Sequence, residues 1–222
     1  MNYLQICQRL RSEAAIAGSG PSSVIGQTGE SLRVVQWVAA AYEDIQNFHS
    51  TWEFLQDDVS FAVNSGVAEY TPTSAGATDL ADWKKDDLRV YSAIADERLL
   101  AYVPWQNFRP YYQIGSKRTQ TGKPSIVTVE PNKNALLWPI PDQAYTFDGQ
   151  YYKKPDKMEG NIDEPIFMSN FHLSIVWRGL MMYGADLGAP DVYAHGRAEY
   201  KKVLRKMESR YIPEMMYGAP LA

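Results

Sequence analysis

Apolar residues repeat at helical spacing at both ends of the chain and at strand spacing in its middle. Near the N-terminus, residues 3–15 and, more strongly, residues 30–48 place apolar side chains on one face of a helix. Residues 17–28 between them are rich in Gly, Ser and Pro, which is typical of a loop. The N-terminal part of the sequence therefore predicts two helices.

The middle of the chain changes to a period of two. Val59, Phe61 and Val63 alternate with polar or small residues, and residues 64–66 supply a turn towards a return strand at residues 67–70. Further strands are predicted at residues 88–94, 98–103, 125–130, 135–138 and 145–153. Residues 131–134 favour a hairpin turn, residues 105–112 a short helix, and residues 113–123 an exposed loop.

Helical periodicity returns after Pro165. Apolar residues between positions 167 and 183 cluster on one side of a predicted helix, which Gly184 and residues 188–190 are expected to end. Asp191 is predicted to cap a last helix that runs to Tyr211. Residues 212–222 are too short to form a core of their own and predict an extended tail.

This order of elements predicts an α+β protein. Its N- and C-terminal helices form an α-helical bundle with an inserted antiparallel β module and an extended C-terminal tail. We expect the bundle to comprise residues 1–50 and 160–211, the β module residues 51–159, and the tail residues 212–222. A body with an inserted module is more typical of a building block of an assembly than of an enzyme.

The composition fits a folded protein, and the charge is uneven. The 222 residues are 45% hydrophobic and 22% charged, with a formal net charge of -4. An acidic chain argues against a general nucleic-acid-binding surface but allows a local basic patch. Residues 51–100 carry 10 acidic and 4 basic side chains (net -6), and residues 191–210 carry 6 basic and 3 acidic (net +3). Such asymmetry can steer subunits or partners together, or can reflect two ordinary solvated surfaces.

Cysteine usage and hydropathy indicate a protein made and folded in a cytoplasm. Cys7 is the only cysteine, so no disulfide can form within the chain, and its place on an apolar helix face predicts a small core residue. The sequence has no stretch of about 18 apolar residues, so no membrane span is predicted. The N-terminal residues do not resemble a signal peptide.

Neither a metal site nor a cofactor site is predicted. His49, His172 and His195 are far apart in sequence, without metal-binding spacing, and are expected at the surface or at interfaces. Residues 18–23 resemble a phosphate-binding loop in composition alone, because they follow a helix and lack the Lys-Ser/Thr pair. We therefore assign no catalytic, cofactor-binding or metal-binding residue.

Three acidic pairs leave one enzymatic alternative open. Asp57-Asp58, Asp86-Asp87 and Asp163-Glu164 each offer the two carboxylates that a glycosidase needs. Exposed aromatic residues of the β module would stack on sugars, giving a carbohydrate-active or glycan-binding protein. Against this, each pair lies at a predicted element boundary, where acidic residues commonly cap or turn the chain, and strand aromatics more commonly pack in a core.

Several local signatures occur in an order that resembles a known family. They are Trp52 to Leu55, Tyr70-Thr71-Pro72, Pro124 to Val129, Ala135 to Asp142, a strand from Tyr145 that reaches Pro155, Asp163 to Ile166, and His172. This order resembles the head-to-tail adaptor proteins of tailed bacteriophages. These are also called connectors or, in short-tailed phages, tail tubular proteins of the gatekeeper type. The resemblance covers residues 30 to 210.

The resemblance implies a non-enzymatic structural protein of the virion, located at the head-to-tail junction. About twelve copies would form a homo-oligomeric ring beneath the portal protein. The helical domain would form the ring body, and the β module would face tail, nozzle or collar proteins. Packaged DNA would pass through the channel, without sequence-specific binding, until ejection. The C-terminal segment would reach the portal through apolar anchors, namely Ile212, Met215, Met216, Tyr217 and Leu221.

A ring needs heterologous interfaces, in which one face of a subunit matches a different face of the next. The uneven charge suggests candidates for such a pair. They are the basic residues Lys201, Lys202, Arg205 and Lys206 and the acidic residues Asp86 and Asp87. A different phage neck or tail-completion protein is a further alternative.

Overall fold

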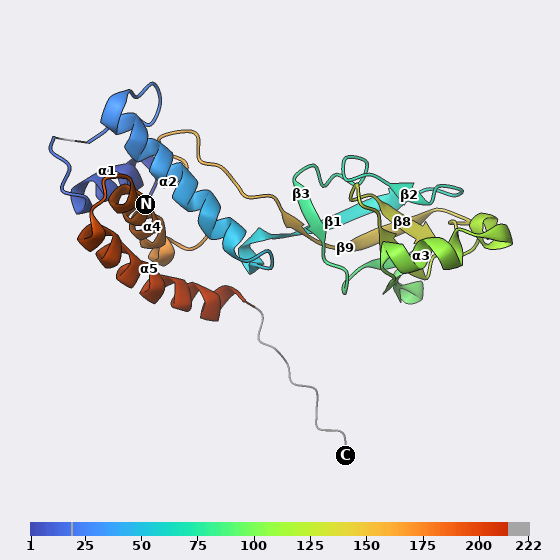
Figure 1. The fold of residues 1–222 in the computed structure, drawn as a ribbon. Coiled ribbons are helices and arrows are strands. Elements are labelled where there is room, and N and C mark those ends of the chain that lie inside the picture. The colour runs from blue at the N-terminus through green and yellow to red at the C-terminus, as the bar shows by residue number, and fades with distance from the viewer. Residues whose placement is uncertain (19, 213–222) are drawn as a thin grey trace, which may run out of the picture. The chain divides into compact units, whose positions relative to one another are not determined.

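The structure is a computed structural model that describes residues 1–18 and 20–212 (Figure 1). It is an α+β protein, as the residue pattern predicts. The chain divides into two compact units. The helical unit comprises Met1–Leu55 and the chain from Pro155 onward, and the β unit comprises Gln56–Lys154. Most of the predicted tail, residues 213–222, lies outside the described residues.

Among the described residues, the helical unit contains four helices and two short 3-10 turns. They are α1 (Tyr3–Glu13), α2 (Gly29–Phe48), α4 (Leu173–Asp186) and α5 (Pro190–Tyr211), with η1 (Glu53–Leu55) and η4 (Ser169–Phe171). A capping box between Asn2 and Gln5 starts α1. The predicted cap of α5 is wrong by two positions: Ala189 is the N-cap, Pro190 is the first residue of the helix, and Asp191 is the second.

Helix α4 is the centre of the helical unit, since it packs against α1, α2 and α5. Gly184 was predicted to help end α4, but it lies inside the helix and allows a close contact with α5. A Cβ atom on it would lie 2.7 Å from the backbone nitrogen of Tyr193. Gly196 of α5 faces the carbonyl oxygen of Trp177 in the same way, at 3.0 Å. Glycine therefore lets the backbones of α4 and α5 approach each other more closely than larger residues would permit.

A buried glutamine fixes the segment by which the chain re-enters the helical unit. Gln46 of α2 is 1% exposed. Its Oε1 accepts a hydrogen bond from the Asp156 backbone nitrogen at 2.8 Å, and its Nε2 donates to the Asp156 carbonyl at 3.0 Å. One turn earlier, the Tyr42 hydroxyl donates to the Asp156 carboxylate and accepts from the Ile166 backbone nitrogen. These bonds satisfy polar groups that would otherwise be buried without partners.

Two predictions about single side chains have opposite outcomes. Cys7 is fully buried in the core, as expected, and burial raises the pKa of its thiol to about 12. His172 was expected at a surface or interface, and this was wrong, because it is 2% exposed. Its Nε2 lies 3.0 Å from the Phe167 carbonyl and its Nδ1 lies 2.8 Å from the Met1 nitrogen.

The β unit contains two sheets. The first has the order β1 (Gln56–Val63), β9 (Tyr145–Lys153), β4 (Arg89–Tyr91), β5 (Arg98–Leu99), and β3 (Leu80–Trp83) also pairs with β9. The second has the order β2 (Glu69–Tyr70), β8 (Ala135–Trp138), β7 (Ile126–Val129), β6 (Ala101–Tyr102). Strand β3 was not predicted. Six of the seven strand pairs in the described residues are antiparallel, as expected, and one pair, β6 with β7, is parallel.

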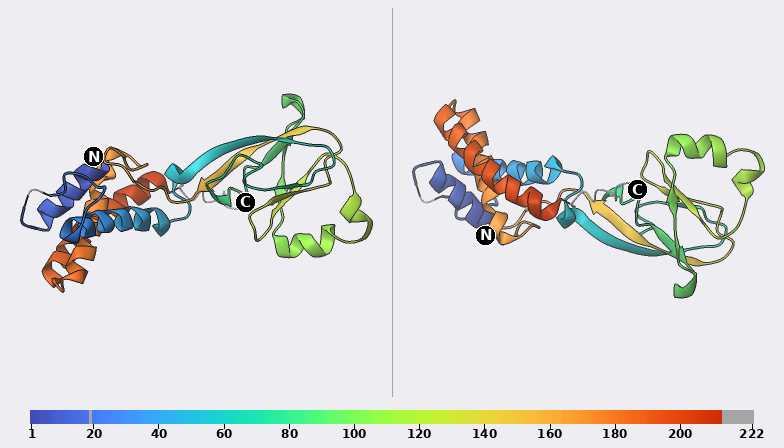
Figure 2. Two further views of the ribbon diagram at one scale, coloured as in Figure 1. Left: turned by 90° about the horizontal axis from the view of Figure 1, so that it is seen from above. Right: turned by 90° about the horizontal axis from the view of Figure 1, so that it is seen from below.

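The predicted first hairpin is wrong, although both of its strands exist. Strand β1 pairs with β9 over its whole length, from Gln56 opposite Tyr152 to Val63 opposite Tyr145. The two strands run side by side in Figure 2. Strand β2 pairs instead with β8 in the other sheet. The Tyr70 hydroxyl accepts from the Asn64 nitrogen and donates to the Val67 carbonyl, so the turn leads the chain between sheets.

Apolar side chains from both sheets form one core in the β unit. Strand β9 shows the alternation clearly, since Tyr145, Phe147 and Tyr151 are buried, whereas Thr146 and Asp148 are half-buried. The predicted hairpin turn at residues 131–134 is confirmed between β7 and β8. Helix α3 (Trp105–Tyr112) is also confirmed, and the predicted loop after it contains η3 (Gly115–Thr119). No helix of the described residues is long and apolar enough to cross a membrane.

Replacing Gln46 with methionine should destabilise the helical unit by about 1–3 kcal/mol. Methionine keeps the volume but leaves the Asp156 nitrogen and carbonyl without their partner. Chemical denaturation followed by circular dichroism measures the change. Asn47→Met is the matched control on the exposed side of α2 and should change stability by less than about 0.5 kcal/mol. Equal stability of the two variants would contradict the role given to Gln46.

The stability of the helical unit should fall below pH 6.5 because of His172. Burial lowers the pKa of His172 below its ordinary value of 6.5. As the pH falls, the unfolded chain therefore takes up this proton before the folded chain does. The contribution of His172 is complete above pH 6.5 and is lost below it, with a slope of up to about 1.4 kcal/mol per pH unit. Denaturation series at several pH values should show a shallower slope for His172→Gln; an identical slope would exclude His172 as the cause.

Candidate functional site

The four basic candidate residues lie together on the exposed side of α5. Lys201, Lys202, Arg205 and Lys206 are all exposed. The opposite side of the helix is buried in the core of the helical unit through Gly196, Tyr200, Leu204, Met207 and Tyr211. The structure therefore brings the predicted cations to one surface, which we call the α5 face.

Two further arginines outside the predicted set extend the α5 face. Arg197 and Arg210 are exposed and continue the rows of cations at intervals of four residues. Four pairs of like charges result, and each such pair destabilises a helix by about 0.2–0.5 kcal/mol. Among the described residues, Lys202 alone of these six cations has a carboxylate partner, Glu199. A surface that keeps such repulsion is suited to an anionic partner.

The acidic candidates are less well suited to an interface. Asp87 is half-buried and accepts two hydrogen bonds from Arg89, at 2.6 and 3.1 Å, so its charge is balanced within the β unit. Other carboxylates of residues 51–100 also form internal ion pairs: Asp57 with Lys153, Asp96 with Lys123, and Asp82 with two lysines. Asp86 is exposed. The net charge of -6 in this segment therefore overstates the negative charge available to a partner.

One of the five portal-binding candidates lies within the described residues. Ile212 is half-buried, packs against the core of the helical unit, and donates a backbone hydrogen bond to the Glu208 carbonyl at 3.0 Å. Met215, Met216, Tyr217 and Leu221 lie outside the described residues. Ile212 thus ends α5 as a cap, and its role in binding is an expectation.

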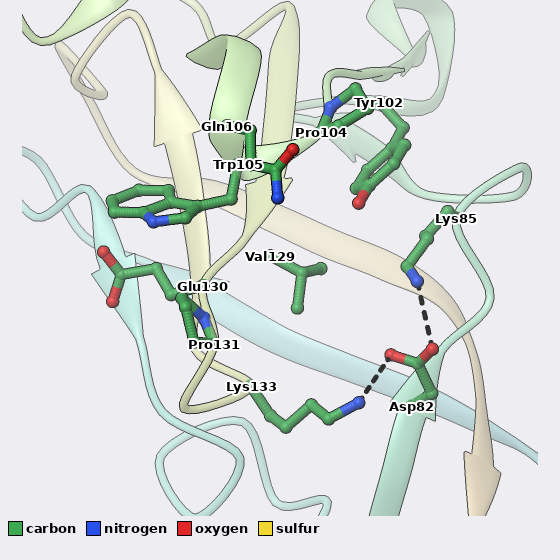
Figure 3. Close-up of a pocket in the computed structure, with 10 residues that line it drawn as sticks. All are labelled: Asp82, Lys85, Tyr102, Pro104, Trp105, Gln106, Val129, Glu130, Pro131 and Lys133. Atoms are coloured by element: carbon green, nitrogen blue, oxygen red, sulfur yellow. Dashed lines mark hydrogen bonds and ion pairs between the residues drawn. The ribbon is translucent and has the colours of Figure 1, made fainter. Parts of the chain in front are cut away.

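A cavity of about 440 Å³ in the β unit is a candidate ligand site (Figure 3). Asp82 of β3 lies on one side of it, with its carboxylate 3.0 Å from the Lys85 ammonium and 3.2 Å from that of Lys133. Partial burial opposes ionisation of Asp82, but the two ammonium groups outweigh it and lower the pKa of the carboxyl. This carboxylate is therefore held as an ion-pair acceptor.

The second carboxylate of the cavity does not face Asp82. Figure 3 shows Glu130 beneath Trp105, on the other side of Val129 from Asp82. Burial and the neighbouring Glu69 raise the pKa of Glu130. The aromatic residues that line the cavity have partners within the chain: Trp105 stacks on Phe108, and the Lys85 ammonium lies 5.4 Å from the centre of the Tyr102 ring. This arrangement lacks the facing carboxylates and open aromatic platform of a glycosidase.

The acidic pairs selected from the sequence do not form such a site either. Asp57 and Asp58 were predicted at an element boundary, and they are the second and third residues of β1. Because successive side chains of a strand alternate, the two carboxylates point to opposite faces of the sheet. Asp163, by contrast, holds a turn as expected, since its carboxylate accepts from the nitrogens of Glu159 and Gly160 at 2.7 Å. These two hydrogen bonds lower the pKa of Asp163.

No cluster of three or more His, Cys, Asp or Glu residues suited to a metal ion occurs in the part of the chain that the structure describes. His49 pairs with Glu208 at 3.1 Å, and the His195 ring packs edge-on against Trp177. The surfaces with unbalanced charge are therefore better candidates for function than the cavities.

Comparisons with known proteins agree with an assembly role. The model of the family described as SU10 adaptor protein matches residues 1–221. No curated protein matches the chain.

Proposed function

The chain belongs to the SU10 adaptor protein family, and on this premise we propose that it joins the head of a tailed bacteriophage to its tail as a ring bound beneath the portal. The family match over essentially the whole chain is the observation that carries the proposal. It agrees with the resemblance noted in the sequence and favours an adaptor over another neck or tail-completion protein. A bacteriophage adaptor is a component of the virion, and a structural family of this kind favours a non-enzymatic role.

The mechanism we propose is assembly by surface complementarity. Copies made in the host cytoplasm would pack side by side, about twelve to a ring. The α5 face would supply one side of the contact between neighbours, because its six exposed cations need an anionic counterpart. Asp86, which is exposed, suits that counterpart better than Asp87, whose charge Arg89 balances.

The two units suggest a division of labour within the particle. In this proposal the helical unit forms the ring body, and the β unit meets tail, nozzle or collar proteins. Ile212 and the residues that follow it dock on the portal, where Met215, Met216, Tyr217 and Leu221 supply apolar anchors. The finished ring would continue the DNA channel from the portal, help to retain the genome, and release it at ejection.

Removal of residues 213–222 should abolish binding to the portal while leaving the rest of the chain folded. All the described residues that form the core of the helical unit remain in the truncated chain. Light scattering with negative-stain imaging of the purified protein, alone and mixed with its portal, measures the assembly. The intact chain should give a ring, alone or on the portal. A truncated chain that still binds the portal would exclude the C-terminal anchors.

Reversing the α5 face should weaken lateral assembly without unfolding the helix. In Lys201→Glu, Lys202→Glu, Arg205→Glu, Lys206→Glu, four exposed cations become carboxylates, so attraction to an anionic neighbour becomes repulsion. We expect at least a tenfold loss of ring formation, measured as mass by light scattering at fixed concentration. Circular dichroism checks the fold. Rings of normal size and yield from the folded variant would refute the role of this face.

A further inference from the structure

A second cationic surface, on the β unit, is not used in the contacts between neighbouring copies or in the portal docking proposed above. Between Glu97 and Glu130 the chain carries no acidic residue over 32 positions, from Arg98 to Val129. Five cations lie within this stretch: Arg98, Arg109, Lys117, Arg118 and Lys123. Three of the five belong to α3 and η3, which we call the α3–η3 lobe (residues 105–119).

The charges of the lobe are available to a ligand. Arg109, Lys117 and Arg118 are exposed, and none of them has a carboxylate partner among residues 1–18 and 20–212. Lys123, in contrast, pairs with Asp96 at 2.9 Å. Arg109 and Arg118 line a groove of about 510 Å³, whose other walls are Pro110, Gln113 and Ile114. The lobe is thus a concave cationic surface within an acidic protein.

The lobe is held in a defined shape by aromatic contacts around the buried Phe108. Phe108 is 2% exposed and stacks on Tyr112, which in turn packs against Trp138 of β8, with ring centres 5.1 and 4.7 Å apart. The Trp138 indole donates to the Lys117 carbonyl at 3.0 Å, and Arg118 donates to the Gln113 carbonyl at 2.9 Å. The cations therefore project from a pre-organised scaffold, which lowers the entropic cost of binding.

We propose that the α3–η3 lobe binds the phosphate backbone of double-stranded DNA without reading its sequence. Beside the three cations, the exposed residues of the lobe include hydroxyl and amide donors (Gln106, Asn107, Tyr111, Ser116 and Thr119) together with Pro110, Ile114 and Gly115, and exposed Gln120 and Thr121 follow the lobe directly. Cations with hydroxyl and amide side chains are the groups that contact DNA phosphates. Protein interfaces are also enriched in Arg and Tyr, so the choice of a polyanion rests on the charge: three cations without a carboxylate partner among the described residues, in a stretch of 32 positions that contains no acidic residue.

Three cations in one copy bind DNA weakly, and the ring assembly proposed above would multiply them. Linked sites gain avidity without any new contact when they engage one polymer together. This step rests on the proposed function, whereas binding by a single copy does not. Contacts to phosphates have no preferred sequence. They can therefore hold DNA at any position along its length while it also passes through the particle.

The test is fluorescence anisotropy of a labelled duplex of about 30 base pairs and mixed sequence, titrated with the full chain at several salt concentrations. Three phosphate contacts predict a slope of about −2.7 for the logarithm of the binding constant against that of salt. Arg109→Glu, Lys117→Glu, Arg118→Glu should lower affinity at least tenfold. Arg118 also stabilises the lobe through its hydrogen bond to the Gln113 carbonyl. The double variant Arg109→Glu, Lys117→Glu retains Arg118 and should still reduce the slope by about 2.

The matched control, Lys154→Glu, Lys157→Glu, changes the total charge by the same amount as Arg109→Glu, Lys117→Glu, at exposed lysines outside both cationic surfaces, and should retain DNA binding. Equal loss in these two double variants, or no binding by the unaltered chain at about 25 mM salt, would overturn the proposal. Polyglutamate and unlabelled DNA should also be compared as competitors at equal concentrations of negative charge. If polyglutamate displaces the labelled duplex more effectively, the proposal is overturned in favour of an acidic protein partner. Ring mass and portal binding of the lobe variant, measured separately, test the proposed function independently and should not change.

Discussion

The whole architecture depends on how the chain leaves the helical unit and returns to it. The β unit interrupts the helical unit between Leu55 and Pro155, so the helical core closes only when the two ends of the insertion come together. Closing a loop of this length costs roughly 4 kcal/mol plus a constant. Strand β1 at the start of the insertion pairs with β9 at its end over eight residue pairs. On the helical side, Gln46 holds the backbone of Asp156 with two hydrogen bonds. Both units therefore contribute to closing the same loop.

This constraint also explains which structural predictions succeeded. The helices, β8 and β9 follow from local periodicity, because one face of each element is buried. Pairing does not follow from local pattern. The turn at residues 64–66 suggests a hairpin, but β1 gains an eight-residue partner in β9, and a return strand could offer far less. Strand β3 was missed because Asp82 interrupts its apolar pattern, although that carboxylate is satisfied by two lysines from outside the strand. His172 was misplaced because its partners come from the distant N-terminus and a neighbouring turn.

The candidate surfaces were visible in the sequence only in part. Cations spaced three and four residues apart in a predicted amphipathic helix must share a face, so the cluster on α5 could be recognised, and Arg197 and Arg210 could have been added by the same rule. The acidic segment could not be judged in this way. Whether Asp87 is available depends on Arg89 beside it, and whether Asp57 is available depends on Lys153, far away in the sequence. Counting charges gives the total, but the ion pairs of the folded chain decide how much of it a partner meets.

Net charge is for this reason a poor guide to what the protein binds. Charges at a solvated surface are screened over about 8–10 Å at physiological salt, so a partner responds to the groups at the surface it touches. In the β unit, carboxylates such as Asp82 and Asp96 are paired with lysines, whereas Arg109, Lys117 and Arg118 have no such partner among the described residues. The helical unit shows the same separation, with repulsion between neighbouring cations kept along α5. An acidic chain can therefore present two cationic surfaces, one on each unit, and these differ in kind. The α5 face is a regular helical row suited to a matching protein surface, and the α3–η3 lobe is a curved set of donors suited to phosphates.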